Sequence, residues 1–438
     1  MKKIMVLFLC FASLLLCAAQ ASSQKETKKP GDAKKKVAKP VLSVVCTPAT
    51  HIAKEGEKVE FKITSTTQDP ITVTISLDGS PEKIFKKVTV KSPAVVTASL
   101  SYPGFLHCHA KTRGAAPCRR AVAVAPEKIR YARKAPADFK KFWESALAES
   151  KALPLDLQIK AINPDKDYNS FVVSCANVNG KRAYALYAYP KNAKGKVPLQ
   201  VMFGGGEAYF AKAIVPGGAK SAKSRFKQDM AVLFLHLPPY EPQDTWSKAR
   251  EFHKEFLKKL GLRRYILVGM DDPKKFYGYS AILGCLRLLE SVAKRPEIDR
   301  EKIVFHGASH GGMFGAYLSY FFPFKAAFIG VPSNCEINAF LEGRYGSTVR
   351  EWKKYWKNTE YYELVYFAPG IKCPVMVGVG FHDRSCPPTG VYSFYNTLPE
   401  GKKQIFNKIR NGHGDAPKEY SPATWKFLAD HIAPQAKK

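Results

Sequence analysis

The sequence is poor in acidic residues, and it has no long apolar run after its first residues. Asp and Glu number 37 against 69 Lys and Arg among 438 residues, which gives a formal net charge of +32 at pH 7. No later segment offers the roughly 18 uninterrupted apolar residues that a membrane-spanning helix needs. The charge comes without a basic helix or an aromatic-plus-basic recognition motif, so we expect no nucleic-acid partner. A surface this basic does favour anionic partners such as an acidic polysaccharide.

Cysteine is scarce as well, with ten residues in the chain. Their number and spacing exclude a disulfide scaffold, and no Cys and His spacing matches a metal site. Cys108 and Cys118 bracket a short turn that contains Gly114, and we predict that they pair. Cys175 and Cys285 lie in apolar runs typical of a strand and a helix, where we expect buried free thiols.

The first 40 residues differ in composition from the rest. Two lysines, an apolar run from Ile4 to Leu16 and the small-residue end Ala19-Gln20-Ala21 predict a signal peptide over residues 1–21. Leu precedes both Cys10 and Cys17, which argues against a lipid anchor. Residues 22–40 contain seven lysines and almost no apolar side chain, which indicates a flexible cationic linker. We therefore expect a protein that is secreted or resides in the periplasm or cell envelope.

Residues 41–126 are expected to form a small all-β domain, an Ig-like sandwich. Short alternating runs rich in Val, Ile, Thr and Phe recur at a spacing of roughly ten residues. The predicted strands are Glu57–Thr64, Ile71–Leu77, Ile84–Val90, Val95–Tyr102 and Arg119–Val124. His107 and His109 flank Cys108 in a further strand-like run, and we expect both histidines on one face of a strand.

Residues 127–438 show apolar strands alternating with amphipathic helices. The predicted helices are Asp138–Ser150, Tyr277–Lys294 and Ser421–Ile432, the last with Ser421 as its N-cap and Pro422 as its first residue. Phe171–Cys175 and Ala183–Tyr189 should form a hairpin, whereas Leu199–Phe203, Val232–His236, Ile303–His306, Ala327–Val331 and Val375–Val379 should be buried parallel strands. This alternation predicts a three-layer α/β domain with a mainly parallel sheet.

A nucleophile motif follows one of these strands. Ser309 lies in Gly307-Ala308-Ser309-His310-Gly311, between the apolar run 303–306 and a predicted helix. Small residues on both sides permit a strained strand-to-helix turn that exposes the serine hydroxyl, as in α/β-hydrolases. The backbone N–H of His310, near a helix N-terminus, is the expected donor to an oxyanion.

The base and the acid should follow Ser309 in the chain, in the order serine, acid, histidine. The histidines after Ser309 are His382, His413 and His431. We favour His413, because it lies in a loop before the last helix, whereas His431 lies within that helix. Asp383 follows the strand that ends near residue 380 and is the expected acid.

Three residues close to His413 and Asp383 are less suited to act as the base or the acid. His382 is adjacent to the acid, and Asp415 and Glu419 come after the base in the chain.

A second oxyanion donor should come from the loop after an early strand. The strand 199–203 runs into Gly204-Gly205-Gly206-Glu207, where glycines allow the backbone to approach a substrate. We assign the donor to Gly206, and Gly205 or Glu207 would fit nearly as well.

Four segments of the catalytic region resemble the acetyl xylan esterase and cephalosporin C deacetylase family of α/β-hydrolases. Pro136–Trp143 is similar to the family's opening helix, and the block Tyr277–Gly312, which supplies two of the four segments, is similar to the central helix, strand and elbow. Asp383-Arg384-Ser385-Cys386-Pro387-Pro388 matches the family's acid segment. The resemblance implies hydrolysis of acetyl esters on carbohydrates or small alcohols, without a metal or an organic cofactor.

The sequence also departs from the family's usual pattern. His310 stands where the family usually has Gln, Gly414 follows the histidine where Glu is common, and the Arg-Gly-Gln segment that supports the family's site is missing. These differences leave open the size of the acyl group, the substrate and whether the chain forms a homo-oligomer.

Two other functions deserve comparison with an esterase acting on a small-molecule or oligosaccharide acyl ester. An exported serine peptidase of the prolyl oligopeptidase type would carry a repeated β-propeller, and the segment before the catalytic region is too short for one. A glycan-binding envelope protein that has lost activity would not need the ordered serine, acid and histidine. The sequence therefore favours a serine carboxylesterase.

Overall fold

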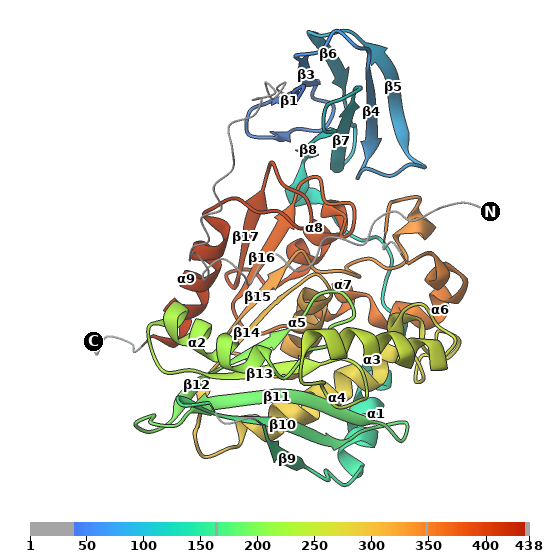
Figure 1. Ribbon diagram of the computed structural model, residues 1–438. Coiled ribbons are helices and arrows are strands. Elements are labelled where there is room, and N and C mark those ends of the chain that lie inside the picture. Colours follow the sequence, from blue (N-terminus) through green and yellow to red (C-terminus); the bar gives the residue numbers. More distant parts are fainter. Residues whose placement is uncertain (1–38, 163–164, 347–348, 434–438) are drawn as a thin grey trace, which may run out of the picture.

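The structure is a computed structural model that describes residues 39–162, 165–346 and 349–433. The predicted signal peptide and nearly all of the predicted linker lie outside these residues. Figure 1 shows a small unit of β-strands above a larger unit built of helices and strands. Within the described residues, no helix is long and apolar enough to cross a membrane.

The larger unit contains a nine-stranded sheet in the order β17-β16-β15-β14-β12-β13-β11-β10-β9. The strands are β9 (Gln158–Ala161), β10 (Tyr168–Ala176), β11 (Arg182–Pro190), β12 (Val197–Phe203), β13 (Ala231–His236), β14 (Ile298–Ala308), β15 (Ala326–Gly330), β16 (Val375–Gly380) and β17 (Lys403–Lys408). Neighbours from β13 to β17 pair in parallel, and β9, β10 and β11 form an antiparallel edge. The predicted mainly parallel sheet is thus confirmed, as is the hairpin.

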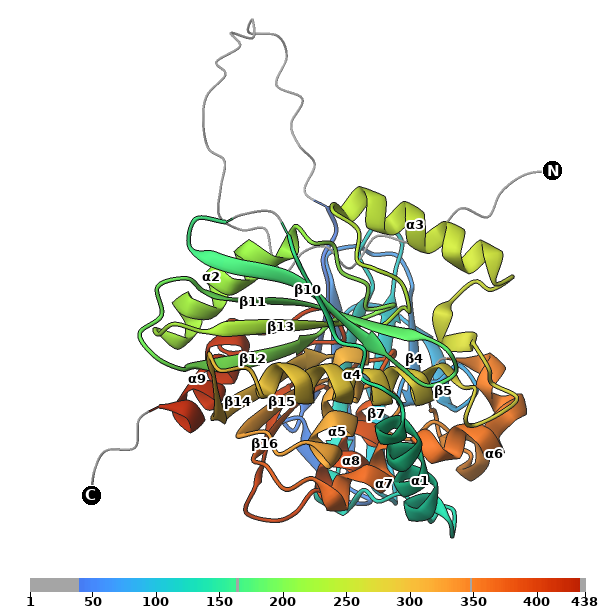
Figure 2. The same cartoon turned by 90° about the horizontal axis from the view of Figure 1, so that it is seen from below.

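Helices cover both faces of this sheet (Figure 2). They are α1 (Phe139–Ala152), α2 (Ile214–Phe226), α3 (Trp246–Lys259), α4 (Tyr277–Ala293), α5 (His310–Phe321), α6 (Trp356–Thr359), α7 (Leu364–Phe367), α8 (Pro388–Thr397) and α9 (Tyr420–Ile432). Short 3₁₀ helices occupy Pro126–Lys128, Tyr265–Leu267, Ala339–Glu342, Arg350–Tyr355, Glu360–Tyr362 and Ala368–Gly370. Strand β13 shows the layering: Val232 and Phe234 pack with α2 and α9, whereas Leu233 and Leu235 pack in the core that contains α4 and α5. Side chains alternate along a strand, so a strand buried on both faces must be apolar throughout.

The smaller unit consists of two sheets that enclose one apolar core. One sheet has the order β1-β3-β6 and the other has the order β2-β8-β7-β4-β5. The strands are β1 (Leu42–Thr47), β2 (Ile52–Ala53), β3 (Val59–Ser65), β4 (Ile71–Leu77), β5 (Ile84–Val90), β6 (Ala94–Ala98), β7 (Gly104–Lys111) and β8 (Cys118–Val124).

Strand β7 is buried on both of its faces. Leu106 and Cys108 point into the core between the two sheets, and Phe105 belongs to the core of the larger unit. His107 and His109 alternate with the first pair, so they share one face of the strand, as predicted from the sequence. Phe105 lies on the same face, which meets the larger unit. The two units are therefore joined by a continuous apolar contact.

Two local predictions were wrong. All eight cysteines among the described residues are free, including Cys108 and Cys118. In the β7–β8 pair Cys108 lies opposite Arg120 and Cys118 lies opposite Ala110, so the two cysteines are diagonal neighbours. Such positions are about 7–8 Å apart, too far for a disulfide bond.

The other error concerns the start of the last helix. Helix α9 begins at Tyr420 with Glu419 before it, so Ser421 and Pro422 lie within its first turn. Proline is tolerated there because the first-turn N–H groups have no partner inside the helix.

Candidate active site

Ser309 lies at the junction between β14 and α5, at the carboxyl edge of the parallel strands. Its backbone has φ 59° and ψ −121°, a conformation that non-glycine residues rarely adopt. Three hydrogen bonds hold it: its N–H donates to the Gly330 carbonyl at 2.9 Å, and its carbonyl accepts from the N–H groups of Met313 and Ser333 at 3.0 and 3.2 Å. The surrounding structure therefore enforces the strained turn that the motif predicted.

The glycines on either side of Ser309 allow this turn to pack closely. A Cβ atom at Gly307 would lie 2.5 Å from the carbonyl oxygen of Gly311, and one at Gly311 would lie 2.2 Å from the carbonyl oxygen of Phe203. Both distances are far below van der Waals contact with backbone atoms. The elbow and the end of β12 can approach each other only if both positions lack side chains.

His413 connects Ser309 to Asp383. Its Nε2 lies 3.0 Å from the Ser309 hydroxyl oxygen, and its Nδ1 lies 2.7 Å from a carboxylate oxygen of Asp383. A carboxylate only accepts, so Nδ1 carries the proton and a neutral ring presents an unprotonated Nε2 to the serine. The three residues come from the ends of β14, β16 and β17, far apart in the chain.

The loop that carries His413 is held by Lys408, the last residue of β17. The buried Lys408 ammonium donates to the carbonyl groups of Gly412, His413 and Asp415, at 2.9, 3.4 and 3.0 Å. Its three protons are thus satisfied, although burial lowers the pKa of this lysine. The Asp415 carboxylate also accepts a hydrogen bond from the Gly412 N–H at 3.1 Å. No sequence pattern marks Lys408, because a lysine at a strand end is ordinarily exposed.

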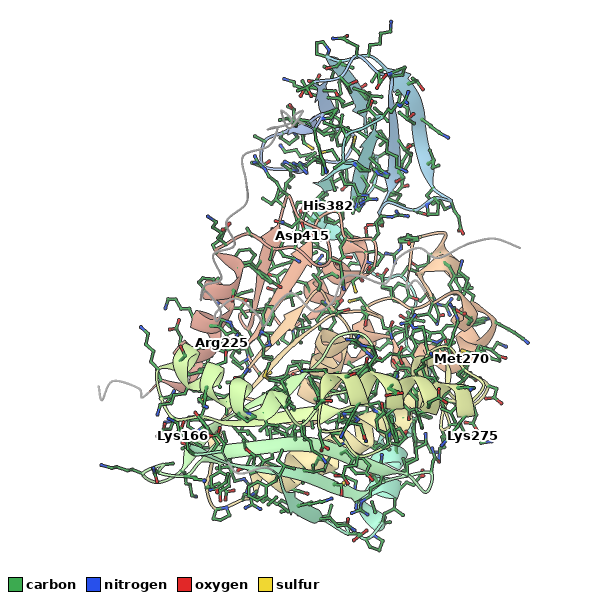
Figure 3. The ribbon with its side chains drawn as sticks, in the orientation of Figure 1. Lys166, Arg225, Met270, Lys275, His382 and Asp415 are labelled. Carbon is green, nitrogen blue, oxygen red and sulfur yellow. The ribbon has the colours of Figure 1, made fainter. Side chains whose placement is uncertain are left out.

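The alternative bases and acids lie elsewhere in the structure. His431 is within α9 and its Nδ1 bonds to the Phe427 carbonyl at 2.7 Å, while the His382 ring bonds to the Arg410 carbonyl at 3.0 Å. Asp415 shapes the loop around Gly412, and Glu419 precedes α9. Figure 3 shows His382 and Asp415 at the end of the larger unit that faces the small β-unit.

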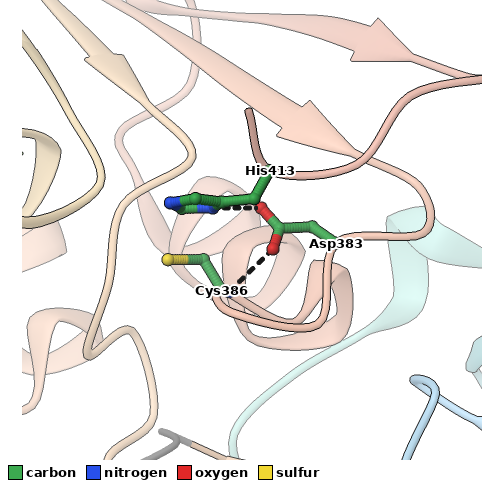
Figure 4. Close-up of side chains that lie close together, drawn as sticks. All are labelled: Asp383, Cys386 and His413. Carbon is green, nitrogen blue, oxygen red and sulfur yellow. Dashed lines mark hydrogen bonds and ion pairs between the residues drawn. The ribbon is translucent and has the colours of Figure 1, made fainter. Parts of the chain in front are cut away.

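Asp383 is completely buried in the loop that follows β16. One carboxylate oxygen accepts the N–H groups of Ser385 and Cys386 at 2.8 and 2.9 Å, and the other faces His413. These bonds fix the carboxylate in the orientation that the imidazole needs (Figure 4). The thiol of Cys386 lies beside His413 and Ser309, and its burial raises the pKa of Cys386 well above the usual range. In the sequence, Cys386 stands out only as part of the acid segment Asp383–Pro388.

His310 ties the elbow to the glycine-rich loop after β12. Its Nδ1 bonds to the Gly206 carbonyl, and its Nε2 lies 3.1 Å from the Tyr277 hydroxyl. Burial lowers the pKa of His310 to about 4, so the ring is neutral at pH 7 and has one N–H. A carbonyl oxygen only accepts, so that proton is on Nδ1 and the tyrosine donates to Nε2.

The loop itself turns back on its own backbone. The Ala208 N–H donates to the Gly205 carbonyl at 3.2 Å, and Gly206 has a φ of +61°. The Glu207 carboxylate accepts the Tyr265 N–H at 2.7 Å, which anchors the loop to the 3₁₀ helix Tyr265–Leu267. The sequence had suggested Gly206, Gly205 and Glu207 as oxyanion donors, and the structure places Gly206 beside His310.

Replacing His310 with alanine should loosen this loop without removing the N–H of residue 310. We expect kcat for a small acetyl ester to fall by about 10- to 100-fold, somewhat less than the loss of a whole oxyanion donor. Tyr277→Phe is the matched control, because it removes only the hydroxyl that orients the imidazole. Steady-state kinetics of the two variants would show whether the bond between His310 and the Gly206 carbonyl supports catalysis. Equal kcat for His310→Ala and the native protein would contradict this role.

One group of side chains among the described residues could offer three ligands to a metal ion. Donor atoms of Asp383, Cys386 and His413 lie within 4.8 Å of one another. Both nitrogens of His413 already bond, to Asp383 and to Ser309. A metal ion bound to this ring would break one of those bonds, so we interpret the group as a hydrogen-bonded set rather than a metal centre.

A family profile and a curated relative match most of this chain. The sequence profile of the acetyl xylan esterase family matches residues 126–431. The acetyl esterase Axe7A of Xylanibacter ruminicola is 25% identical over 374 residues, which cover 80% of this chain and 81% of that protein.

Solved structures show the same fold. An acetyl xylan esterase from Paenibacillus sp. R4 superimposes with a TM-score of 0.58 at 20% identity, covering 70% of this chain and 98% of that one. Acetyl xylan esterase 1 from Thermoanaerobacterium sp. JW/SL YS485 gives 0.54 at 19% identity, with the same coverage of both chains.

The fold and these relatives define a carboxylic ester hydrolase of the α/β-hydrolase class. Because the family profile spans more than half of the sequence, the chain belongs to the acetyl xylan esterase family.

Proposed function

We propose that this protein is an exported serine carboxylesterase that removes acetyl groups from acetylated carbohydrates. The observation that carries the proposal is His413, which bonds to Ser309 through one nitrogen and to Asp383 through the other. Membership of the acetyl xylan esterase family supports the acetyl ester as the bond that is cleaved.

In the proposed mechanism, His413 accepts the Ser309 proton as the serine oxygen attacks the ester carbonyl. Asp383 stabilises the imidazolium that forms. The N–H groups of His310 and Gly206 donate to the oxyanion, and α5 directs its positive end toward it. His413 then protonates the departing sugar oxygen, which leaves an acetyl group on Ser309. A water molecule that gives its proton to His413 attacks this acyl-enzyme and releases acetate.

Release of acetate from acetylated xylan is the direct test. We expect Ser309→Ala to abolish release above the rate without enzyme, because a methyl group cannot attack the carbonyl. Ser291→Ala is a matched control, since its hydroxyl donates to the Arg287 carbonyl of its own helix α4. Native activity in Ser309→Ala would sink the proposal. Acetate release with p-nitrophenyl acetate but not with xylan would reject the carbohydrate substrate and keep the esterase.

The chain's remaining regions fit an exported enzyme. Residues 1–21 would direct export, residues 22–40 would tether the folded part, and residues 41–126 would form an Ig-like sandwich before the catalytic region 127–438. The family profile begins at residue 126, which supports this division. The basic composition would favour contact with anionic polysaccharide at the site of action.

A further inference from the structure

The small β-unit contacts both flanks of the loop that carries Asp383. We define this acid loop as residues 381–387, between β16 and α8. Phe105 of β7 packs edge-to-face on Phe381, with ring centroids 5.2 Å apart, and also contacts Tyr392 of α8 at 5.6 Å. One aromatic ring of the β-unit therefore touches the first residue of the acid loop and the helix that follows it.

The N-terminus of α8 has no cap of its own. Pro387 and Pro388 stand at its N-cap and first helical positions, and neither proline has an N–H or a polar side chain. Thr389 is therefore the first residue of this helix with an N–H that needs an acceptor. The acceptor comes from the other unit: Asp78 takes the Thr389 hydroxyl at 2.7 Å and the Thr389 N–H at 3.4 Å, both on Oδ1. A carboxylate at this position also favours the positive end of the helix.

Asp78 is itself held in an unusual position. It follows β4 with a φ of 48°, and its N–H donates to the Phe105 carbonyl at 3.0 Å. Gly79 allows the turn to approach the acid loop, because a Cβ there would lie 2.9 Å from both the Arg384 side chain and the His107 ring. The backbone of this turn is thus shaped to meet the acid loop.

Burial of the Asp78 carboxyl in this contact also has a cost in folding free energy. Asp78 is fully buried, and its Oδ2 has no hydrogen-bond partner among the described residues. Burial raises the pKa of Asp78 to about 6. Apolar side chains usually make such an interface more stable than a buried carboxyl does. A buried carboxyl kept at a unit interface, on the helix next to a catalytic loop, points to a role in placing that loop.

We propose that Asp78 is a positioning residue for the esterase: it caps α8 from the β-unit and so holds Asp383 in line with His413. The proposal rests on the proposed function, in which Asp383 orients the catalytic histidine. It assigns to the β-unit, which lies outside the matched family profile, a direct part in the geometry of the active site.

Kinetics of Asp78→Ala and Asp78→Asn in the full-length protein test the proposal. Asp78→Ala removes the acceptor, and we expect kcat for p-nitrophenyl acetate to fall about tenfold with KM within twofold of the native value. Asp78→Asn keeps an oxygen for Thr389 and should restore kcat to within about twofold. Thr389→Val, which keeps the side-chain shape and loses the hydroxyl, should lower kcat by a smaller factor than Asp78→Ala.

A loss of activity through general instability must be distinguished from mispositioning. Ile63→Ala removes a buried side chain from β3, in the sheet that does not carry Asp78, and should lower Tm while leaving kcat unchanged at 25 °C. Full kcat in Asp78→Ala, no rescue by asparagine, or an equal fall in kcat for Ile63→Ala would each overturn the positioning role. These outcomes are separate from those that reject the proposed function, which is tested with Ser309→Ala and with acetylated xylan.

Discussion

Replacing Asp383 with asparagine should reduce kcat by about 10³- to 10⁴-fold while the protein stays folded. The asparagine oxygen can still accept the N–H groups of Ser385 and Cys386, so the acid loop keeps its internal bonds. The amide N–H₂ group cannot accept the proton on His413 Nδ1, and the imidazole then favours the tautomer with its proton toward Ser309. A histidine protonated on that side cannot act as the base.

Asp415→Asn is the matched control for this variant. Asp415 lies two residues from His413, yet its carboxylate accepts hydrogen bonds from Gly412 and Asn411, and an asparagine oxygen can still accept the Gly412 N–H. We expect a loss of less than tenfold in kcat. Thermal unfolding would verify that both variants fold. Similar kcat values for Asp383→Asn and Asp415→Asn would contradict the assignment of the acid.

Among substitutions that add one methyl group to the turn around Ser309, Gly311→Ala should be the most disruptive. The added Cβ would lie 2.2 Å from the carbonyl oxygen of Phe203 and 3.1 Å from that of Gly204, so either the elbow or the end of β12 must move. Phe203 is paired on both sides, with Leu235 of β13 and Gly307 of β14, which leaves little freedom for the strand. A shift of about 1 Å in the nucleophile can cost about 100-fold in rate.

We therefore expect at least a 100-fold lower kcat for Gly311→Ala, together with a lower Tm. Gly217→Ala is the control, because a Cβ at that position in α2 would meet nothing within 4 Å. Alanine is the better helix former there, so Tm should stay constant or rise slightly. Native kcat in Gly311→Ala would show that the elbow does not pack as described.

The buried strands and the order of the site residues could be predicted because both leave local signals. Strands such as β13 and β16 are covered on both faces and are continuous apolar runs. The elbow motif restricted the base to three later histidines. By contrast, the first turns of α2 contain Pro216 and two glycines, residue types that sequence rules place in turns, and this helix escaped prediction.

The contacts by which Asp78 and His310 hold loops of the active site could not be predicted, because they join segments that are distant in the chain. Asp78 and Thr389 are separated by 311 positions in the chain. The bond from His310 to Gly206 joins two loops that follow β14 and β12, and it exists only once these two strands lie side by side in the sheet. Tertiary packing, rather than local sequence preference, determines these positions.

The central claim is that Ser309 is the nucleophile of an esterase, and covalent labelling tests it most directly. A fluorophosphonate reacts only with a serine activated by a base, and its adduct can be located by mass spectrometry of the digested protein. We predict one equivalent of label on the peptide that contains Ser309, a parallel loss of acetylesterase activity, and no label in Ser309→Ala or His413→Ala. Complete loss of activity with the label on another residue, or full activity of the enzyme labelled at Ser309, would contradict this account.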